Sequence, residues 1–245
     1  MTFVKRLMLL MLPMTLGVVG CSSSQQDTQL LDELANLDKE TIFERAENLY
    51  SDEKYQEARG LFSFVYDSFP NDPMGHKAAL RVADTYSVKR DVTSLTEARL
   101  RYRDFANRYP NDPDRDYALL MVGQTYSARK LRPDRDLSDI GEALSAYQQL
   151  VNLYPNSRYV SEAQTRMEDL RELLAEHEWL VGEFYLRNKR FQGALGRFEF
   201  IQENYPNFSK IESVNAKISE LETIIAERDA EWKRHIEALE KSSED

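Results

Sequence analysis

The residue types that most often carry chemistry are sparse in this 245-residue chain and lie far apart. Its histidines, His76, His177 and His235, form no metal-ligand cluster with one another or with a cysteine. His177 and Glu178 begin like the zinc-protease motif His-Glu-x-x-His, but the second histidine would fall where Val181 stands. The chain also has no phosphate-binding glycine loop and no Gly-x-Ser-x-Gly elbow. We therefore expect no enzyme: no catalytic residue, no metal and no cofactor.

A charged stretch at 130–139 offers the one other candidate for a metal site. Its carboxylates, among them Asp134 and Asp136, are the ligand type that divalent cations prefer. Arginines stand between these carboxylates, as Arg135 does, and would pair with them. A solvated loop with internal ion pairs is the favoured interpretation.

Cys21 is the only cysteine, and its surroundings point to covalent lipidation. Lys5 and Arg6 precede an apolar run at 7–19, which is shorter than the roughly 20 residues that a membrane-spanning helix needs. Small residues stand directly before Cys21, as at a bacterial lipoprotein cleavage site. We expect a signal peptide at 1–20 and a lipidated tether at 21–38. An ordinary signal peptide with an incidental cysteine is the alternative.

The elements that must position any functional residue follow from an internal repeat. A seventeen-residue pattern occurs four times with unchanged spacing: apolar, two residues, Ala, three residues, aromatic, six residues, aromatic-Pro-Asn. The copies begin at Tyr55, Leu95, Ile140 and Phe191 and end at Asn71, Asn111, Asn156 and Asn207. The alanine and the apolar residues four and seven positions later share one helical stripe. Each copy therefore predicts a helix that ends at its aromatic-Pro step.

A second amphipathic segment precedes each copy, at 40–51, 75–88, 114–128 and 157–188, so the repeating unit is helix-turn-helix. Asp72-Pro73 and Asp112-Pro113 each predict a helix start, with aspartate as the cap and proline as the first helical residue. The pattern's offsets match the second helix of a tetratricopeptide repeat, although the period exceeds its 34 residues. We expect an all-α, tetratricopeptide-like solenoid with four repeats over 39–207.

The last segment, 208–245, reads as one long helix. Its apolar residues lie mostly on one stripe, interrupted by Arg228: Ile211, Val214, Ile218, Leu221, Ile225, Trp232, Ile236 and Leu239. Solenoids need a terminal element that covers the last repeat. We expect the first half of this helix to cap the solenoid, and the second half either to continue the cap or to meet a partner.

The charge balance excludes one class of partner. Without Lys5 and Arg6 the chain keeps 30 basic and 42 acidic residues, a net charge of −12. Such a chain is repelled by phosphate, so we expect no nucleic-acid partner. It would not adhere to an anionic lipid surface through charge either, so membrane attachment requires the lipid at Cys21.

Tyrosines recur late in the first helices, at Tyr50, Tyr86, Tyr126 and Tyr185. First helices line the concave face of a tetratricopeptide solenoid. Packing between helices, with the hydroxyl near the surface, is the favoured interpretation. In the alternative, Tyr50, Tyr86 and Tyr126 line a groove for an extended peptide or a short helix.

Residues 134–207 carry the most specific resemblance, which is to the BamD family of outer-membrane protein assembly lipoproteins. The resembling positions include Asp134-Arg135-Asp136, Ala143, Tyr147, Leu150-Val151, the Tyr154–Tyr159 stretch, Ala163, Leu170-Arg171, Leu174-Ala175, Glu178, Val181, Glu183-Phe184-Tyr185 and the Asn188–Phe191 turn. The long first helix of the fourth unit is also typical of the family. After Asn207 the chain departs, because one uninterrupted helix replaces the usual fifth helix pair.

The resemblance implies a scaffold on the periplasmic face of the outer membrane. Its implied partners are a BamA-like protein with POTRA domains, other assembly lipoproteins and unfolded outer-membrane barrel proteins. Arg197, Tyr185 and Arg190 fall in the region that implies contact with the BamA-like partner. An alternative function is that of another tetratricopeptide lipoprotein of the cell envelope, such as a pilotin that escorts a secretin.

Overall fold

The computed structural model describes residues 34, 36–128, 133–134 and 137–244, and within these residues it is all-α, with no strand. Cys21 and most of the tether lie outside the described residues, as does much of the charged stretch at 130–139. None of the described helices is long and apolar enough to cross a membrane.

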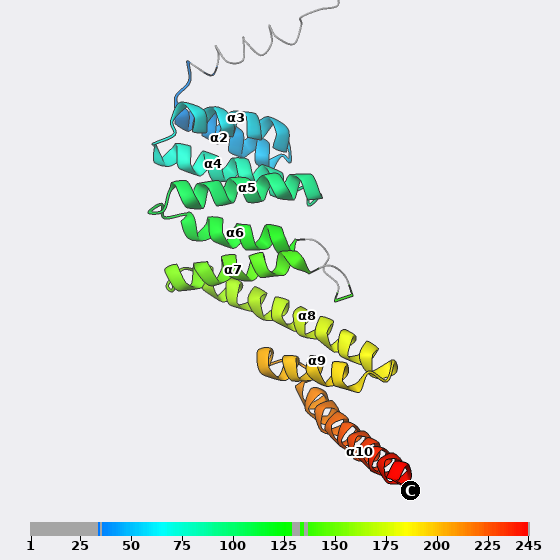
Figure 1. The fold of residues 1–245 in the computed structure, drawn as a ribbon. Helices are drawn as coiled ribbons and strands as arrows, with labels where there is room; N and C mark the ends of the chain where they lie inside the picture. The colour runs from blue at the N-terminus through cyan, green and yellow to red at the C-terminus, as the bar shows by residue number, and fades with distance from the viewer. Residues whose placement is uncertain (1–33, 35, 129–132, 135–136, 245) are drawn as a thin grey trace, which may run out of the picture.

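The helices stack in chain order into a solenoid (Figure 1), which confirms the predicted fold class. Each packs mainly against its neighbours in sequence. Their bounds are α2 (Lys39–Ser51), α3 (Tyr55–Ser68), α4 (Pro73–Ser87), α5 (Val92–Arg108), α6 (Arg115–Ser127), α7 (Ser138–Leu153), α8 (Val160–Arg187), α9 (Phe191–Asn204) and α10 (Ile211–Glu244). The pairs α2/α3, α4/α5, α6/α7 and α8/α9 are the four helix-turn-helix units, and α10 follows them.

The repeated pattern forms the core. In every copy the alanine and the aromatic four residues later are fully buried: Ala58, Ala98, Ala143 and Ala194 with Phe62, Tyr102, Tyr147 and Phe198. The residue seven after the alanine is buried as well, whereas the aromatic before the proline is only partly covered, as Phe69 at 37% exposure shows. Removing each ring from water stabilises the fold by about 1.5–3 kcal/mol.

Two glycines let first and second helices approach closely. A Cβ on Gly123 of α6 would lie 2.4 Å from the Tyr147 ring, and one on Gly182 of α8 would lie 2.9 Å from the Phe198 ring. Both aromatics are the buried rings of the repeat. The absence of a side chain at these positions therefore sets the distance between the paired helices in the last two units.

The helix boundaries agree with the sequence at the prolines and differ at one start. All four second helices end one residue before the aromatic-Pro step. Asp72 caps α4 as expected, because its Oδ1 accepts a hydrogen bond from the Met74 amide at 2.9 Å. The start predicted at Asp112-Pro113 is wrong, since α6 begins at Arg115. There Asp112 is held in a turn by the Asp114 amide at 2.9 Å and by His76 Nδ1 of α4 at 2.7 Å.

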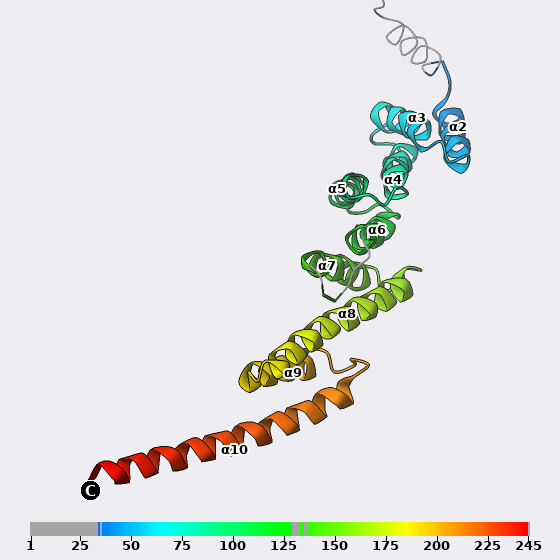
Figure 2. The same cartoon turned by 90° about the vertical axis from the view of Figure 1, so that its right-hand side faces the viewer.

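The last helix covers α9 with its first half, and its second half extends past the end of α9. Val214, Ile218 and Leu221 of α10 are buried with Phe198 and Ile201 of α9 in one apolar cluster. Beyond Leu221 nearly every described side chain is exposed or partly exposed. Figure 2 shows this half of α10 projecting past the end of the stack.

Candidate partner-binding surface

The tyrosines of the predicted groove lie beneath arginine side chains. The Arg59 guanidinium of α3 stacks on Tyr86 of the next unit, 3.7 Å from the ring centre. Arg99 of α5 stacks in the same way on Tyr126 of its next unit, at 4.2 Å. Both arginines directly follow the buried alanine of the repeat, so the stacking recurs with the repeat. Such contacts contribute about 0.5–2 kcal/mol each.

The third tyrosine is covered differently. The guanidinium of Arg81, from α4, lies 4.0 Å from the centre of the Tyr50 ring in α2. Arg81 also binds both carboxylate oxygens of Glu47, at 2.6 and 2.5 Å. Burial works against its charge, yet hydrogen bonds to Glu47 and Asp84 raise the pKa of the guanidinium. Arg81 is therefore a permanently charged link between α2 and α4.

Asp84 is the buried centre of this polar network. Its Oδ1 accepts hydrogen bonds from the Tyr102 hydroxyl at 2.6 Å and the Tyr117 hydroxyl at 2.8 Å, and its Oδ2 binds Arg81 at 3.0 Å. Burial first, and then the charge of Asp84, raise the pKa of Tyr102 and of Tyr117. Both tyrosines stay protonated and act as donors. The network joins α4, α5 and α6.

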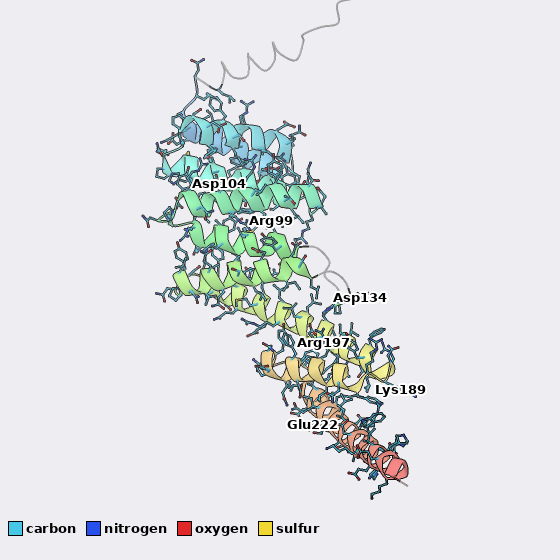
Figure 3. The ribbon with its side chains drawn as sticks, viewed as in Figure 1. Arg99, Asp104, Asp134, Lys189, Arg197 and Glu222 are labelled. Carbon is cyan, nitrogen blue, oxygen red and sulfur yellow. The ribbon has the colours of Figure 1, made fainter. Side chains whose placement is uncertain are left out.

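A ligand on this side would meet arginines before tyrosine rings. Tyr126 is only 8% exposed, and its hydroxyl accepts a hydrogen bond from Arg103. Tyr50 and Tyr86 are partly buried. Arg99, seen in Figure 3, has no acidic partner within ion-pair distance among the described residues. Whether a peptide binds here stays a prediction, in which partly exposed guanidinium groups would be the hydrogen-bond donors.

The second predicted set, Arg197, Tyr185 and Arg190, is only partly brought together. Arg190 directly precedes α9, and its amide donates to the Tyr185 carbonyl at 3.0 Å. Arg197 lies farther along α9, away from Lys189 at the turn (Figure 3), and donates to Glu178 of α8 at 2.9 Å. Its side chain is 44% exposed, so it can still meet a partner at the cost of this ion pair.

His76 and His177 are tied to neighbouring elements. His76 pairs with Asp112 and lies against the Tyr109 ring, with 3.8 Å between ring centres. His177 Nδ1 donates to the Pro133 carbonyl at 2.5 Å. Among the described residues, no group of three or more His, Cys, Asp or Glu side chains is placed to hold a metal ion.

Sequence reasoning missed the arginine layers and the Asp84 network. An Ala-Arg pair at the same repeat position, Ala58-Arg59 and Ala98-Arg99, was a visible signal for the layers. In the third and fourth copies leucine follows the alanine instead, as Leu144 and Leu195. The charged layers therefore belong to the N-terminal half of the solenoid.

Comparison with known proteins places the chain in a family. The model of the YfiO family, described as outer membrane lipoprotein, matches residues 35–236, which is most of the chain. The chain belongs to the YfiO family. The expected resemblance to BamD is confirmed, because its relatives carry that name.

The matching relatives differ in how much of this YfiO-family chain they cover. The outer membrane protein assembly factor BamD of Rickettsia prowazekii (strain Madrid E) is 24% identical over 203 residues, 80% of this chain and 74% of that protein. BamD of Vibrio cholerae is 37% identical over 76 residues, 31% of this chain and 32% of that protein. BamD of Xylella fastidiosa (strain 9a5c) is 39% identical over 72 residues, 29% of this chain and 25% of that protein. The chain thus spans a third or less of the length of these last two relatives.

Among solved structures, a thermophilic tetratricopeptide protein of Thermus thermophilus aligns with 75% of this YfiO-family chain and 98% of its own. The TM-score is 0.39 and the sequence identity 16%.

Proposed function

We propose that the protein is a lipid-anchored scaffold that aids the assembly of β-barrel proteins into the outer membrane. The match of an outer membrane lipoprotein family across 35–236 carries this proposal. Relatives named as outer membrane protein assembly factors support the same role. A solenoid acts by presenting surfaces along its length, which suits a protein that holds several partners at once.

Attachment through Cys21 would hold the scaffold at the periplasmic face of the membrane. None of the described helices could span a bilayer, and the net charge after removal of the signal opposes adsorption to anionic lipid. Several acyl chains on one residue give stable anchoring where a single chain does not. The tether at 21–38 would then separate the solenoid from the lipid surface.

The two halves of the solenoid offer different surfaces for different partners. In the N-terminal half, Arg59, Arg99 and Arg103 lie over tyrosine rings. Guanidinium groups beside aromatic rings suit a peptide that ends in an aromatic residue and a carboxylate, such as the C-terminal signal of an unfolded barrel protein. In the C-terminal half, the α8/α9 unit with Arg190 and Arg197 would contact POTRA domains of a BamA-like protein and sibling lipoproteins.

Replacing the cysteine tests the anchor. Cys21→Ser is expected to move the protein from the membrane fraction to the soluble fraction of the cell envelope, with its thermal unfolding unchanged. Ser24→Ala, three residues away, is the matched control and should remain in the membrane fraction. Membrane retention of Cys21→Ser would count against lipidation as the anchor.

A pull-down from crosslinked envelopes tests the partners directly. We expect a protein with POTRA domains among the crosslinked species, and we expect Arg197→Glu to reduce its yield. Glu178→Gln removes the intramolecular pair of Arg197 without removing the arginine, and should leave the yield the same or higher. Recovery of a secretin and no POTRA protein would favour the pilotin function instead.

A further inference from the structure

The helices α8 and α10 begin in the same way relative to the repeat. Pro155 precedes α8 as Pro206 precedes α10, an offset of 51 residues. With this offset Ala163 corresponds to Val214, Met167 to Ile218 and Leu170 to Leu221, and all six side chains are buried. The two helices therefore present matching faces to the helix before them, α7 and α9 respectively.

α8 is longer than α7, and α10 is longer than α9. Each of the two long helices therefore extends past the end of the shorter helix that it covers. On α8 the overhanging part meets Pro133, which lies between α6 and α7, and His177 donates to the Pro133 carbonyl at 2.5 Å. The fold therefore already places a backbone carbonyl, in the turn at Pro133-Asp134, against α8 at this point. His177 is the residue that binds it.

On α10 the corresponding place is not covered by a connection. The turn between α8 and α9 is only Asn188–Arg190, too short to reach along α10. A pocket of about 810 Å³ remains there, between that turn and the second half of α10. Arg228, the counterpart of His177, and Trp232, the counterpart of Val181, both line this pocket.

The pocket combines apolar rings with cations. Trp232 is 65% exposed, and the Arg228 guanidinium lies 5.2 Å from the centre of the Phe191 ring. Lys189, Arg190 and Arg228 outnumber the acidic lining residues Asp229 and Glu231, although the whole chain carries an excess of ten acidic over basic residues. No ion pair between these lining residues is formed in the described structure.

We propose that this pocket binds a segment of a partner protein, in which a bulky apolar side chain is flanked by carboxylates. The apolar side chain packs on Trp232 and Phe191, and the carboxylates and backbone carbonyls accept hydrogen bonds from Arg228 and Arg190. The segment takes the place on α10 that corresponds to the place of Pro133 on α8. The inference rests on the proposed scaffold function, for which it specifies the chemistry of one partner.

Site-specific photo-crosslinking in cells that produce the full-length protein tests this site. The photoreactive residue p-benzoylphenylalanine replaces Trp232 in one strain, and Glu222, an exposed residue on the same helix (Figure 3), in a control strain. We expect light-dependent adducts at position 232 and far fewer at 222. Mass spectrometry of the adduct should find an attached segment rich in aspartate and glutamate.

Charge reversal supplies the specificity test. Arg228→Glu in the position-232 strain should lower the adduct about tenfold, since the new carboxylate would repel the carboxylates of the bound segment. Lys233→Glu, the same charge change on an α10 residue outside the pocket, should leave the adduct unchanged. Arg228→Gln keeps much of the side-chain volume and should give an intermediate loss of adduct. It replaces Arg228→Glu in the test if that variant does not fold.

Adducts at 232 no stronger than at 222, attachment to a basic segment, or insensitivity to Arg228→Glu would overturn the inference. Levels of outer-membrane barrel proteins in the same strains separate this failure from failure of the scaffold function. If depletion of the whole chain lowers those levels while position 232 gives no adduct, the pocket inference fails and the scaffold function stands.

Discussion

Single side chains decide how the N-terminal units hold together, and Asp84 is the clearest case. Its buried carboxylate serves three donors from three helices. A buried donor that loses its partner cannot turn to water instead, so such a centre costs more to remove than a surface ion pair.

Asp84→Ala is expected to lower the free energy of unfolding by about 3 kcal/mol, because it leaves the buried Tyr102 hydroxyl, the partly buried Tyr117 hydroxyl and Arg81 short of a partner. Urea denaturation measures the change. Asp104→Ala removes an exposed carboxylate paired with Arg108 and should change the midpoint little. Equal effects of the two variants would show that the Asp84 network is not stabilising.

Two tyrosines, Tyr102 and Tyr117, predict how the stability of the protein depends on pH. Burial and the charge of Asp84 raise the pKa of Tyr102 and Tyr117 in the folded protein. Below a pH of about 10, the ordinary tyrosine value, both states keep these protons and the stability is complete. Above it the unfolded chain releases protons that the folded chain retains, so stability falls as pH rises.

The urea midpoint of the wild-type protein should therefore fall between about pH 8 and about pH 11. The midpoint of Tyr102→Phe should be lower than that of the wild type at about pH 8 but should fall less steeply. A slope for Tyr102→Phe equal to that of the wild type would contradict this origin of the alkaline loss.

The distance between the two helices of a pair is set by the small residues at their contact. Gly123→Ala should destabilise the protein, because the new methyl group would lie 2.4 Å from the Tyr147 ring and the ring is fully buried. An overpacked core of this kind costs about 1–3 kcal/mol. Gly60→Ala and Gly196→Ala are matched controls with no atom within 4 Å of the new carbon.

These controls should raise the stability by about 0.5–1 kcal/mol, since alanine favours a helix over glycine. Thermal unfolding, followed by circular dichroism, measures the stability of all three variants. Stabilisation by Gly123→Ala would mean that α6 and α7 are free to move apart.

The two halves of α10 should differ in what they contribute to stability. Deleting 226–245 removes no side chain that is buried in the described part of the chain and should shift the melting temperature by less than about 2 °C. Deleting 211–245 uncovers Phe198 and Ile201 and should lower it strongly. A large effect of the shorter deletion would mean that the second half of α10 supports the fold rather than a partner.

The ends of helices were predictable from sequence because proline acts locally. The aromatic-Pro step stops α3, α5, α7 and α9 whatever surrounds it. The start of α6 was not predictable, because the contact of Asp112 with His76 joins residues 36 positions apart. The ion pair of Arg197 with Glu178 of α8 was not predictable either, because it joins residues of two different helices. For the same reason the sequence did not predict the arginines that stack on tyrosines of the next unit.

The whole molecule is an elongated stack of helices. Its two halves differ in chemistry, with arginine layers toward the N-terminal end and a pocket with aromatic and basic side chains at the overhang of α10. This division is compatible with the proposed scaffold function, in which different surfaces of the solenoid meet different partners.

Depleting the protein from cells and quantifying barrel proteins in the outer membrane tests this account most directly. The account predicts a fall in many barrel proteins, restored by the wild-type chain and poorly restored by Cys21→Ser. Unchanged barrel-protein levels after complete depletion would contradict it.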